Sequence, residues 1–395
     1  MPRTIAFYLP QFHAIPENDE WWGDGFTEWV NVRRARPQYE AHVHPRVAGA
    51  LGEYDLTDAT VYERQTLLAR EAGVDGFCMY FYWFNGKRLL EAPVEAWRQD
   101  SSLLPYCLSW ANESWTRRWD GKSRSVLIAQ SYDEAFEERL FEDLLPHFRA
   151  PHYIKHDGKP VLLVHRAQIV PSSRDFAARL NEFATAAGFP GVHLVASETT
   201  PGLVPESLGF DAVAEFPPVG ANTLRSAQIA PVRGVRRGFR GRLMSYPRMA
   251  RRFEERRPAA YVRYPGVTPG WDNTARRQES ATIYLGSSPA RYAAWLASAR
   301  RREESARGAN GFVFINAWNE WAEGAYLEPD AEHDHEYVRA TSDPEHYTPR
   351  PGTPRPRFGR FWALGHLQSL ALITIGTVLA TGRQIVNRLR SRTRV

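Results

Sequence analysis

Eight short apolar runs recur along the chain, and helix-length segments separate them. Apolar runs of strand length that alternate with helical patterns are typical of parallel strands joined by crossover helices. Eight such units predict an α/β fold, namely a TIM-type (β/α)8 barrel with long strand-to-helix loops. The runs are TIAFYLP, VDGFCMYFYWF, LPYCLSWAN, KPVLLVHR, VHLVASE, FDAVAEFP, a weaker YPGVTPGW and GFVFINAWN.

Two of the separating segments carry clear helix signals. Residues 58–73 place apolar side chains at helical spacing and end at Gly73, and residues 172–188 do the same and end at Gly188. A glycine directly after a helical apolar pattern is a common helix stop. We therefore expect both segments to be barrel helices, and we expect the barrel domain to occupy residues 1–345.

A long excursion interrupts the repeat after the first run. Residues 21–52 are rich in aromatic residues, contain prolines and begin WWGDGFTEW. Such a stretch predicts a substrate-covering loop in place of a barrel helix. Aromatic residues make up 13% of the chain and include 13 tryptophans. That excess predicts an aromatic-lined cleft, because aromatic faces stack on sugars or bases.

The net charge of +5 is distributed unevenly. One segment between the sixth and seventh runs concentrates arginines, and this predicts an anionic partner. Nucleic acid is not expected, because the segment lacks the interleaved aromatics that stack on single-stranded bases. A lipid or phosphate contact explains the same charge. The arginines are Arg225, Arg233, Arg236, Arg237, Arg240, Arg242, Arg248, Arg251, Arg252, Arg256 and Arg257.

The C-terminal part of the chain departs from the barrel pattern. A Pro- and Arg-containing linker at residues 346–360 leads to a tail, 361–395, that is first apolar and then basic. The apolar part is long enough to cross a bilayer, but arginines flank both of its ends. We expect an interfacial or re-entrant helix on an anionic membrane surface. The alternative is a helix that packs back on the barrel.

Two further features concern the cellular compartment. Cys78 and Cys107, the two cysteines, lie inside apolar runs, which favours buried reduced thiols over a disulfide framework or a metal site. The N-terminal sequence MPRTIAFYLPQF enters a strand pattern directly and lacks the layout of a secretory signal. We expect a cytoplasmic protein, peripheral on the inner face of the cytoplasmic membrane.

The candidate catalytic residues are Glu320 and Glu323, which follow the eighth apolar run in INAWNEWAEGAYLEPD. Paired carboxylates suit glycosidic chemistry, because one protonates the leaving oxygen while the other acts on the opposite side of the reacting carbon. A dry aromatic setting and a neighbouring charge both raise the pKa of such a pair. Their spacing leaves retention and inversion undecided. Helix capping or a bracing role for Glu320 are the structural alternatives.

Polar and aromatic clusters also follow other strand runs. The clusters are QFH after the first run, WFN after the second, NESW after the third, WDNTAR after the seventh and NEWAEG after the eighth. In this fold, functional residues gather at the C-terminal ends of the strands. We therefore expect these clusters to meet around the glutamates.

No cofactor is expected, and no metal. The chain contains no GxGxxG after a strand, no P-loop and no Asp-x-Asp pair. The run EPDAEHDHEY, residues 328–337, has carboxylates that a hard ion would accept, but a charged loop needs no ion to be stable. His13 has no second histidine at ligand spacing, so a hydrogen-bonding role is expected for it.

Six motifs together resemble those of the WbsX-type, glycoside hydrolase family 99-like proteins of bacterial surface-polysaccharide biosynthesis. The resemblance runs in order from residue 4 to residue 330. The motifs are AFYLPQFH, WWGDGFTEW, GFCMYFYWFNGKRLLE, LSWANESWTRRWDG, GWDNTARR and INAWNEWAEGAYLEPD.

This resemblance implies a TIM-type barrel whose Glu-x-x-Glu pair acts at an anomeric carbon with retention. In the hydrolase branch the first glutamate assists attack by the sugar's own 2-hydroxyl, through an anhydro-sugar intermediate, and the second is the general acid and base. Glu320 and Glu323 match these two positions. The WbsX branch is described as glycosyltransferases.

Around the pair we expect aromatic side chains to stack on sugar faces and amides and carboxylates to hold hydroxyls. Arg276 is expected to meet a phosphate or a sugar carboxylate. The predicted substrate-binding residues are Tyr8, Gln11, His13, Tyr80, Tyr82, Trp83, Trp110, Asn112, Glu113, Trp271, Asp272, Asn273, Arg276, Trp318 and Asn319.

Three functions fit these features. The first is a membrane-associated retaining glycosyltransferase of O-antigen or other surface-polysaccharide assembly, with a glycan substrate that is lipid-linked. The second is an endo-acting retaining glycoside hydrolase of the mannosidase kind. The third is a non-catalytic glycan-binding scaffold, which predicts that neither glutamate is needed.

Overall fold

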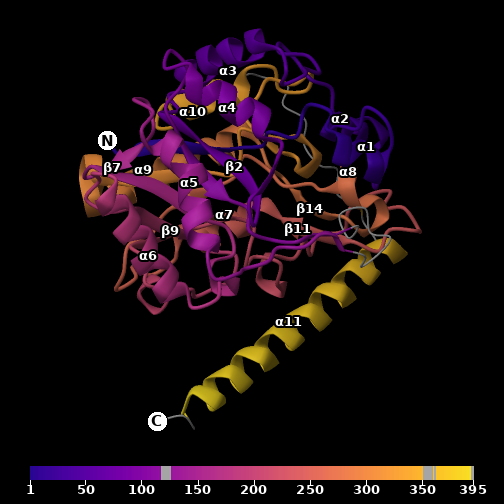
Figure 1. The fold of residues 1–395 in the computed structure, drawn as a ribbon. Coiled ribbons are helices and arrows are strands. Elements are labelled where there is room, and N and C mark those ends of the chain that lie inside the picture. Colours follow the sequence, from indigo (N-terminus) through magenta and orange to yellow (C-terminus); the bar gives the residue numbers. More distant parts are fainter. Residues whose placement is uncertain (117–125, 350–358, 360–361, 393–395) are drawn as a thin grey trace.

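The eight apolar runs form the eight parallel strands of a barrel that is ringed by helices. The computed structural model describes residues 1–116, 126–349, 359 and 362–392, with side chains up to residue 382. Figure 1 shows the strands running through the centre of the domain. The barrel strands are β1 (Arg3–Tyr8), β2 (Gly76–Phe84), β4 (Tyr106–Trp110), β8 (Lys159–Val164), β9 (His193–Ser197), β10 (Ala212–Ala214), the pair β12 (Arg263–Tyr264) and β13 (Gly266–Val267), and β15 (Phe312–Ile315).

The seventh strand closes the barrel in two short pieces. Its first piece pairs with β10 and its second with β15, and Pro265 separates them. Proline lacks the N–H that a ladder requires, which explains why this run is the weakest in the sequence. The backbones approach closely here, since a β-carbon at Gly266 would lie 2.0 Å from the Glu215 carbonyl oxygen. The predicted (β/α)8 barrel is therefore confirmed.

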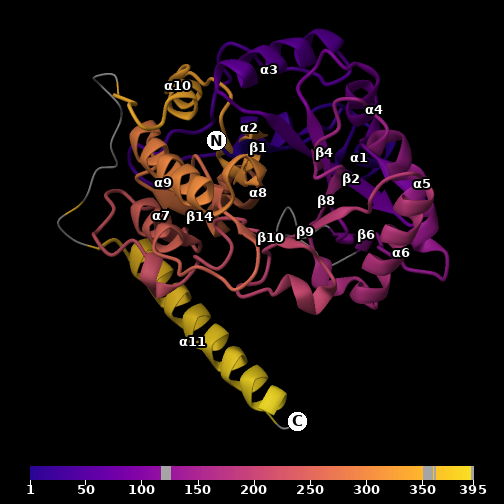
Figure 2. The same cartoon turned by 90° about the vertical axis from the view of Figure 1, so that its left-hand side faces the viewer.

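Most strand connections contain the expected helix on the outside of the barrel (Figure 2). The N-cap Asp58 side chain accepts a hydrogen bond from Thr60 N, and Gly73 takes a positive φ of 65° where the first of these helices ends. The connection from β9 to β10 differs, because a short 3-10 turn at Pro205–Leu208 replaces the helix. The outer helices are α3 (Ala59–Glu71), α4 (Glu91–Gln99), α5 (Phe136–Phe148), α6 (Ser173–Ala186), α7 (Tyr246–Glu254), α9 (Pro289–Arg307) and α10 (Glu336–Ser342).

The long excursion after β1 is more structured than the predicted loop. It contains two short helices, α1 (Pro16–Trp22) and α2 (Glu28–Arg34). Proline at the first position of α1 suits a helix start, because that position needs no hydrogen-bond donor. The Trp29 indole donates to the Tyr54 carbonyl, which ties α2 to the chain that follows it.

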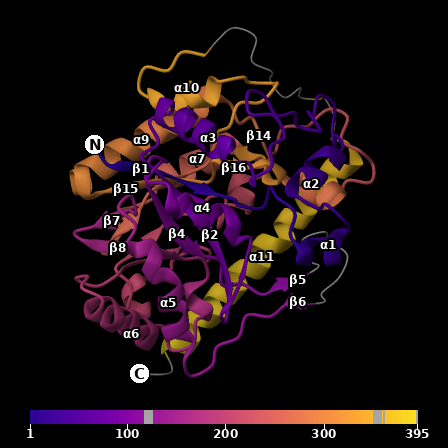
Figure 3. The same cartoon turned by 45° about the horizontal axis from the view of Figure 1, so that its top comes forward.

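Two smaller sheets lie at the strand-to-helix end of the barrel. β11 (Arg242–Ser245) and β14 (Thr282–Leu285) form a parallel pair, with helices α7 and α8 (Thr274–Arg277) in the chain between them. β5 (Trp115–Thr116) and β6 (Val126–Ile128) form an antiparallel pair, which lies beside α1 in Figure 3. Further hairpins are made by β3 (Lys87–Leu89) with β2, β7 (Lys155–His156) with β8, and β16 (Asn319–Glu320) with β17 (Ala325–Tyr326).

The tail forms one helix, α11 (Leu364–Arg392), whose C-terminal half extends away from the barrel domain in Figures 1 and 2. Over Leu364–Gly382 this helix is long and apolar enough to cross a membrane. Its first half packs on the β11–β14 sheet. Most of the predicted linker, 346–360, lies outside the described residues.

Candidate active site

The two candidate catalytic glutamates lie in a tight hairpin directly after β15. Glu320 ends β16, and Glu323 ends the 3-10 turn Trp321–Glu323 that leads into β17. Gly324 follows with a positive φ of 60°, and a β-carbon there would lie 3.0 Å from the Asp272 β-carbon. The hairpin therefore places both side chains at the C-terminal end of the barrel, where the fold gathers functional residues.

One arginine binds both glutamates and a third carboxylate. Arg276 Nη2 lies 3.0 Å from Glu320 Oε2, and Arg276 Nη1 lies 2.6 Å from Glu323 Oε1. Arg276 Nε lies 3.3 Å from Glu28 Oε2, which comes from α2 in the excursion. The side chains of Arg276, Glu320 and Glu28 are 8%, 6% and 2% exposed, whereas that of Glu323 is 21% exposed. Glu323 is thus the carboxylate of this group that is most open to the solvent.

Burial dominates the protonation of this group. It raises the pKa of Glu320 to about 8, against the lowering effect of Arg276 and with a further raising effect of Glu323. Burial also raises the pKa of Glu323. Three carboxylates surround a single guanidinium, so full ionisation would leave uncompensated negative charge in a dry site. The group therefore retains a proton near neutral pH.

A cleft of about 660 Å³ opens above the pair. A cavity of this size accommodates a small glycan, and its lining mixes aromatic rings with a few polar groups, as ligand sites do. The lining residues are Tyr80, Tyr82, Ala111, Glu113, Ser114, Trp115, Thr116, His165, Phe216, Trp271, Asn273, Arg276, Arg277, Glu320 and Glu323. The structure therefore brings eight of the residues predicted from the sequence to one cleft: Tyr80, Tyr82, Glu113, Trp271, Asn273, Arg276, Glu320 and Glu323.

The phenols of Tyr80 and Tyr82 face the glutamates from β2. Burial raises the pKa of each phenol, and the charge of Glu320 adds to the increase. Both tyrosines therefore remain hydrogen-bond donors across the ordinary pH range. Gln11 Nε2 donates to the Tyr82 hydroxyl at 2.9 Å, so Gln11 supports the cleft wall from behind.

The wall of the cleft carries a second charged group. Glu113 Oε1 accepts from Arg166 Nη1 at 2.6 Å, and Glu113 Oε2 lies 3.8 Å from His165 Nε2. Burial lowers the pKa of His165, whose ring packs edge-on against Phe216 at a centroid distance of 5.3 Å. A neutral imidazole and a carboxylate on this wall suit hydroxyl groups of a sugar.

A narrow slot adjoins the cleft beneath the excursion. Trp115 and Thr116 line both cavities, and Glu28 lies between the slot and Arg276. The lining of the slot combines aromatic rings with the amides of Gln11, Asn18 and Asn31. Its remaining lining residues are Gln11, Asn18, Trp22, Phe26, Asn31, Arg34 and Leu127.

Four of the predicted aromatic residues do not reach the cleft. Successive residues of a strand point to opposite faces, so a side chain next to a cleft residue points toward the outer helices. The Trp83 indole accordingly donates to Asp143 of α5, and Trp110 packs on Phe176 of α6. The other two, Tyr8 and Trp318, both contact Phe77.

Three predicted polar residues are instead buried supports. Asn319 bonds both the N–H and the carbonyl of Leu9, and Asn112 bonds the same two backbone groups of Arg166. Each amide therefore fixes the backbone at the end of a neighbouring strand. His13 is 3% exposed and lines none of the cavities described above, and burial lowers its pKa.

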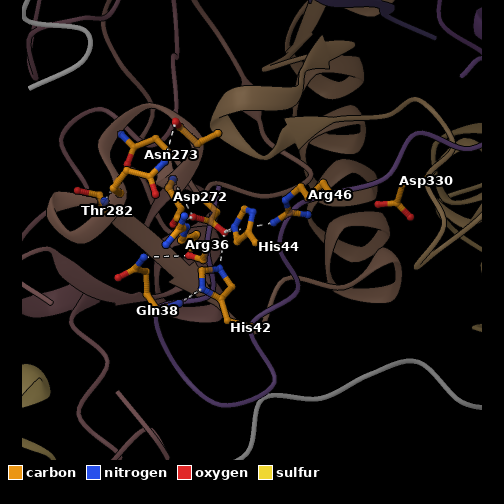
Figure 4. Close-up of polar contacts among 12 residues, drawn as sticks. Arg36, Gln38, His42, His44, Arg46, Asp272, Asn273, Thr282 and Asp330 are labelled. Atoms are coloured by element: carbon orange, nitrogen blue, oxygen red, sulfur yellow. Dashed lines mark hydrogen bonds and ion pairs between the residues drawn. The ribbon is translucent and has the colours of Figure 1, made fainter. Parts of the chain in front are cut away.

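Asp272 also lies outside the cleft, in a buried cluster shown in Figure 4. Its Oδ2 atom is 2.7 Å from His42 Nε2, 2.7 Å from His44 Nε2 and 3.4 Å from Arg46 Nη2. Its other oxygen accepts from Thr274 N at the start of α8. These donors hold the pKa of Asp272 well below its ordinary value in spite of burial.

The donor set of two histidines and an aspartate suggests a metal site, and all three ligand atoms lie within 4.8 Å of one another. However, Gln38 N donates to His42 Nδ1 at 3.0 Å. That bond fixes the ring proton on Nε2, the atom that faces Asp272, whereas a metal-bound histidine needs a lone pair there and a proton on its other nitrogen. The cluster fits a hydrogen-bonded support better than a metal centre.

The predicted carboxylate-rich loop at residues 328–337 is likewise built by hydrogen bonds. Asp330 accepts from the Tyr326 hydroxyl at 2.6 Å and from the backbone of Glu332 at 3.0 Å. Glu328 is 1% exposed and accepts from Tyr54, Gln65 and Trp321. Donors from the protein itself therefore satisfy the carboxylates of Glu328 and Asp330.

The sequence analysis missed several residues of the site. Glu28, the third ligand of Arg276, lies within the quoted motif WWGDGFTEW. His165 is the first residue after strand β8, and Phe216 is the second residue after strand β10. Taking the residues after every strand run, including the fourth and sixth, would have found these two.

The chain resembles known proteins over most of its length. The family model described as Glycosyltransferase WbsX matches residues 4–341. Two curated proteins called "Uncharacterized protein WxcX", from two strains of Xanthomonas campestris pv. campestris, are each 46% identical over 344 residues. The alignment covers 86% of this chain and 49% of each relative, so the chain spans about half the length of the curated relatives it matches.

Solved structures share the fold at low sequence identity. A "Glycoside hydrolase-like protein" gives a TM-score of 0.57 at 12% identity, covering 88% of this chain and 94% of its own. The GH99 endo-alpha-mannosidase of Bacteroides thetaiotaomicron, solved with BIS-TRIS-propane, gives 0.55 at 14% identity, covering 86% and 95%. At this identity the likeness establishes the barrel architecture.

Proposed function

Because the chain belongs to the WbsX glycosyltransferase family, a family of carbohydrate-active enzymes, we propose that it is a retaining glycosyltransferase of O-antigen or other surface-polysaccharide assembly. The observation that carries the proposal is the pair of Glu320, which is buried, and Glu323, which is partly exposed, on one guanidinium beneath an aromatic cleft of about 660 Å³. Two carboxyl groups that share a proton at the base of such a cleft are equipped to act at an anomeric carbon.

The resemblance to family 99 supplies the roles of the pair. Glu320, as a carboxylate, removes the proton of the substrate's 2-hydroxyl, and that oxygen attacks the anomeric carbon. Glu323 donates its proton to the leaving oxygen as the glycosidic bond breaks. The acceptor hydroxyl then attacks the anomeric carbon and returns a proton to Glu323, while the 2-oxygen regains its proton from Glu320. The greater exposure of Glu323 suits a group that exchanges protons with incoming acceptors.

The cleft lining supports binding of a sugar. The rings of Tyr82 and Trp115 meet edge to face at 5.1 Å, and Trp271 faces the cleft from the segment before α8. Rings in such positions stack on sugar faces, while Asn273 and Glu113 offer groups for hydroxyls. Arg276 is already paired with both glutamates. We therefore assign it the role of lowering their pKa values, and not the role of binding a substrate phosphate.

We further propose that the substrate is a lipid-linked glycan, met at the cytoplasmic surface of the membrane. The sequence contains no P-loop and no Asp-x-Asp pair for a nucleotide sugar, whereas its apolar helix and exposed arginines suit a membrane surface.

The experiment that tests the transferase combines purified protein, cell-envelope membranes and candidate sugar donors. We expect sugar to enter lipid-linked glycan, and we expect Glu320→Gln and Glu323→Gln each to reduce incorporation by about 10² to 10⁴-fold, the usual contribution of acid–base groups. Glu328→Gln is the matched control, because Glu328 is a buried carboxyl of the same segment that lies outside the cleft. Incorporation that survives in both glutamate variants would instead favour a glycan-binding scaffold.

A glycoside hydrolase is the second candidate, favoured by the fold shared with an endo-alpha-mannosidase. It predicts release of reducing sugar ends in the same assay without incorporation into lipid-linked glycan. Both activities would depend on the same two glutamates, so the products decide between them.

A further inference from the structure

The C-terminal helix α11 presents two different stripes, one of mixed polarity and one apolar. One stripe, which contains His366, Ser369, Ile373 and Thr377, faces the barrel domain at the three- and four-residue spacing of a helix face. The other stripe faces away from the domain and exposes large apolar side chains. These are Leu364 (52% exposed), Leu367 (49%), Leu372 (38%), Ile375 (57%), Val378 (65%) and Leu379 (58%).

The inner stripe is held by specific hydrogen bonds. His366 Nδ1 accepts from Val232 N at 3.2 Å, while His366 Nε2 lies 2.7 Å from the Gln228 carbonyl oxygen. Ser369 Oγ accepts from Leu243 N of β11 at 2.8 Å, and Thr377 Oγ1 accepts from Leu224 N at 3.1 Å. These bonds satisfy one backbone group of β11 and three of the segment 224–232 that precedes it, so the helix is part of the fold as far as Thr377.

The outer surface of the helix is prepared for an apolar environment. The hydroxyls of Thr374 and Thr381 bond to the carbonyls of Leu370 and Thr377 of the helix itself. Hydroxyls that bond back to their own helix need no water. The helix carries no acidic residue, and its sequence turns basic from Arg383 onward.

A patch of arginines lies beside the start of the helix. Val232 bonds His366, Trp362 Nε1 donates to the Ile229 carbonyl at 3.0 Å, and a β-carbon at Gly365 would lie 2.6 Å from the Arg236 carbonyl oxygen. Within this loop Arg236, Arg237 and Arg240 are exposed, and none of them has an ion-pair partner among the described residues. By contrast, Arg252 donates four hydrogen bonds inside the fold, and Arg256 pairs with Glu198. The arginine-rich segment is thus divided between structural residues and this exposed patch.

We propose that the outer stripe of α11, Trp362 and the exposed arginines form one docking surface that rests in the headgroup region of an anionic bilayer, with the helix parallel to the membrane. The surface combines a half-exposed indole, a continuous apolar stripe and uncompensated positive charge, which are the features of an interfacial helix. This deepens the membrane contact of the proposed function and does not depend on the catalytic roles.

The same contacts exclude a crossing while the helix is docked. A helix needs about 20 apolar residues to span the hydrocarbon core. Only residues 378–382 separate Arg383 from Thr377, which is the last residue with a bond to the domain among the side chains that the structure describes. A crossing would require His366, Ser369 and Thr377 to leave the domain together and would expose the buried cluster around Phe239 and Leu243.

The test is co-sedimentation of the full chain with phosphatidylcholine vesicles and with mixed phosphatidylcholine–phosphatidylglycerol vesicles. We expect binding to the mixed vesicles, weakened by salt, and loss of that binding in the double variant Ile375→Asp/Val378→Asp. Leu67→Asp is the matched control, since Leu67 on α3 is 65% exposed. The triple variant Arg236→Gln/Arg237→Gln/Arg240→Gln should bind on the order of a hundredfold more weakly, at about fivefold per arginine. Arg149→Gln/Arg174→Gln/Arg179→Gln removes three exposed arginines elsewhere and is its control.

Three outcomes would overturn the proposal. Equal binding by parent and Ile375→Asp/Val378→Asp would show that the stripe does not touch lipid. Membrane protein that resists alkaline carbonate extraction from cells would show a crossing helix. A dimer in lipid-free solution that the same double variant dissociates would show that a second copy covers the stripe. None of these readouts uses catalysis, so failure here leaves the transferase proposal intact, and failure of the transferase assay leaves this one intact.

Discussion

The guanidinium of Arg276 lies 3.0 Å from the carboxylate of Glu320, and both side chains are more than 90% buried. The same guanidinium also contacts Glu323 and Glu28, so it is the charge that makes three neighbouring carboxyl groups compatible with burial. Removal of one partner from a buried ionic group costs about 3 to 5 kcal/mol, because the other charges remain uncompensated.

The variant Arg276→Gln should therefore lower the free energy of unfolding by about that amount near neutral pH and abolish turnover. The loss of stability should shrink at acid pH, because protonation of Glu320 and Glu323, whose pKa values burial raises, removes repulsion that Arg276 balances. Chemical denaturation of parent and variant over a pH series measures this. A stability difference that is independent of pH would contradict the charge argument, and Arg179→Gln controls for loss of an exposed arginine.

The raised pKa of Glu320 has a consequence for the intact protein. A carboxyl group whose pKa rises on folding, here from an ordinary 4.5 to about 8, binds more protons in the folded state. Its contribution to the free energy of unfolding is therefore present at low pH and is lost as the pH rises from about 4.5 to about 8. Glu320→Gln should flatten the fall in stability across this range, and an unchanged slope in denaturation experiments would contradict the assignment.

Activity should also depend on the protonation of Glu320, but it should rise over the pH range in which the stability falls. If Glu320 acts as a carboxylate, kcat/KM should rise with pH through the pKa of about 8 and level off above it. A profile that falls through this pH would mean that Glu320 is the proton donor, and the roles of Glu320 and Glu323 would then be exchanged. The pH profile of Tyr80→Phe is the comparison for that of the parent protein, because the Tyr80 phenol contributes no charge in this range.

Asp272 links three segments behind the cleft, and its N–H donates to the Glu323 carbonyl at 2.6 Å. We expect Asp272→Asn to lower the free energy of unfolding by about 2 to 4 kcal/mol, since His42, His44 and Arg46 lose a charged acceptor. We also expect kcat to fall more than KM rises, because α8 carries Arg276. Kinetics at a temperature where the variant remains folded separate the two effects.

The same cluster supports a prediction about metals. Since His42 presents a protonated Nε2 to Asp272, Zn²⁺ should not raise the Tm of the protein, whereas a ligand bound to the folded state would raise it. A zinc-dependent increase that disappears in Asp272→Asn would establish a metal centre and contradict the hydrogen-bond assignment.

Much of this architecture can be predicted from the sequence, and the features that cannot be predicted from it depend on contacts between distant parts of the chain. The strand runs predict the barrel because buried parallel strands must be apolar on both faces. The pairing of β12 and β13 with different neighbours cannot be read from the sequence, since it depends on how Pro265 and Gly266 close the circle. Likewise Glu28 lies 292 positions before Glu320 in the chain, and only the folded excursion brings it to Arg276.

The faces of the three predicted aromatic residues on β2 follow from the alternation of side chains along a strand. Tyr80 and Tyr82 are two positions apart and share the cleft face, whereas Trp83 must point to the opposite face. The same rule separates Phe7, which packs on Tyr80, from Tyr8, which contacts Trp97 of α4. Composition alone favours Tyr8 and Trp83 as much as Tyr80 and Tyr82, because aromatic residues suit both a core and a sugar cleft.

A pair of conservative substitutions tests this alternation directly. Tyr82→Phe removes only the hydroxyl that Gln11 contacts and that faces Glu320, so we expect a change in stability of about 1 kcal/mol and a tenfold or greater loss of kcat/KM. Trp83→Phe removes the indole that donates to Asp143 and leaves a cavity beside α5, so we expect about 2 kcal/mol lower stability with kcat/KM per folded molecule unchanged. Denaturation curves and kinetics of both variants provide the comparison. If Trp83→Phe lost activity without losing stability, Trp83 would have to reach the substrate, and the assignment of β2 faces would be wrong.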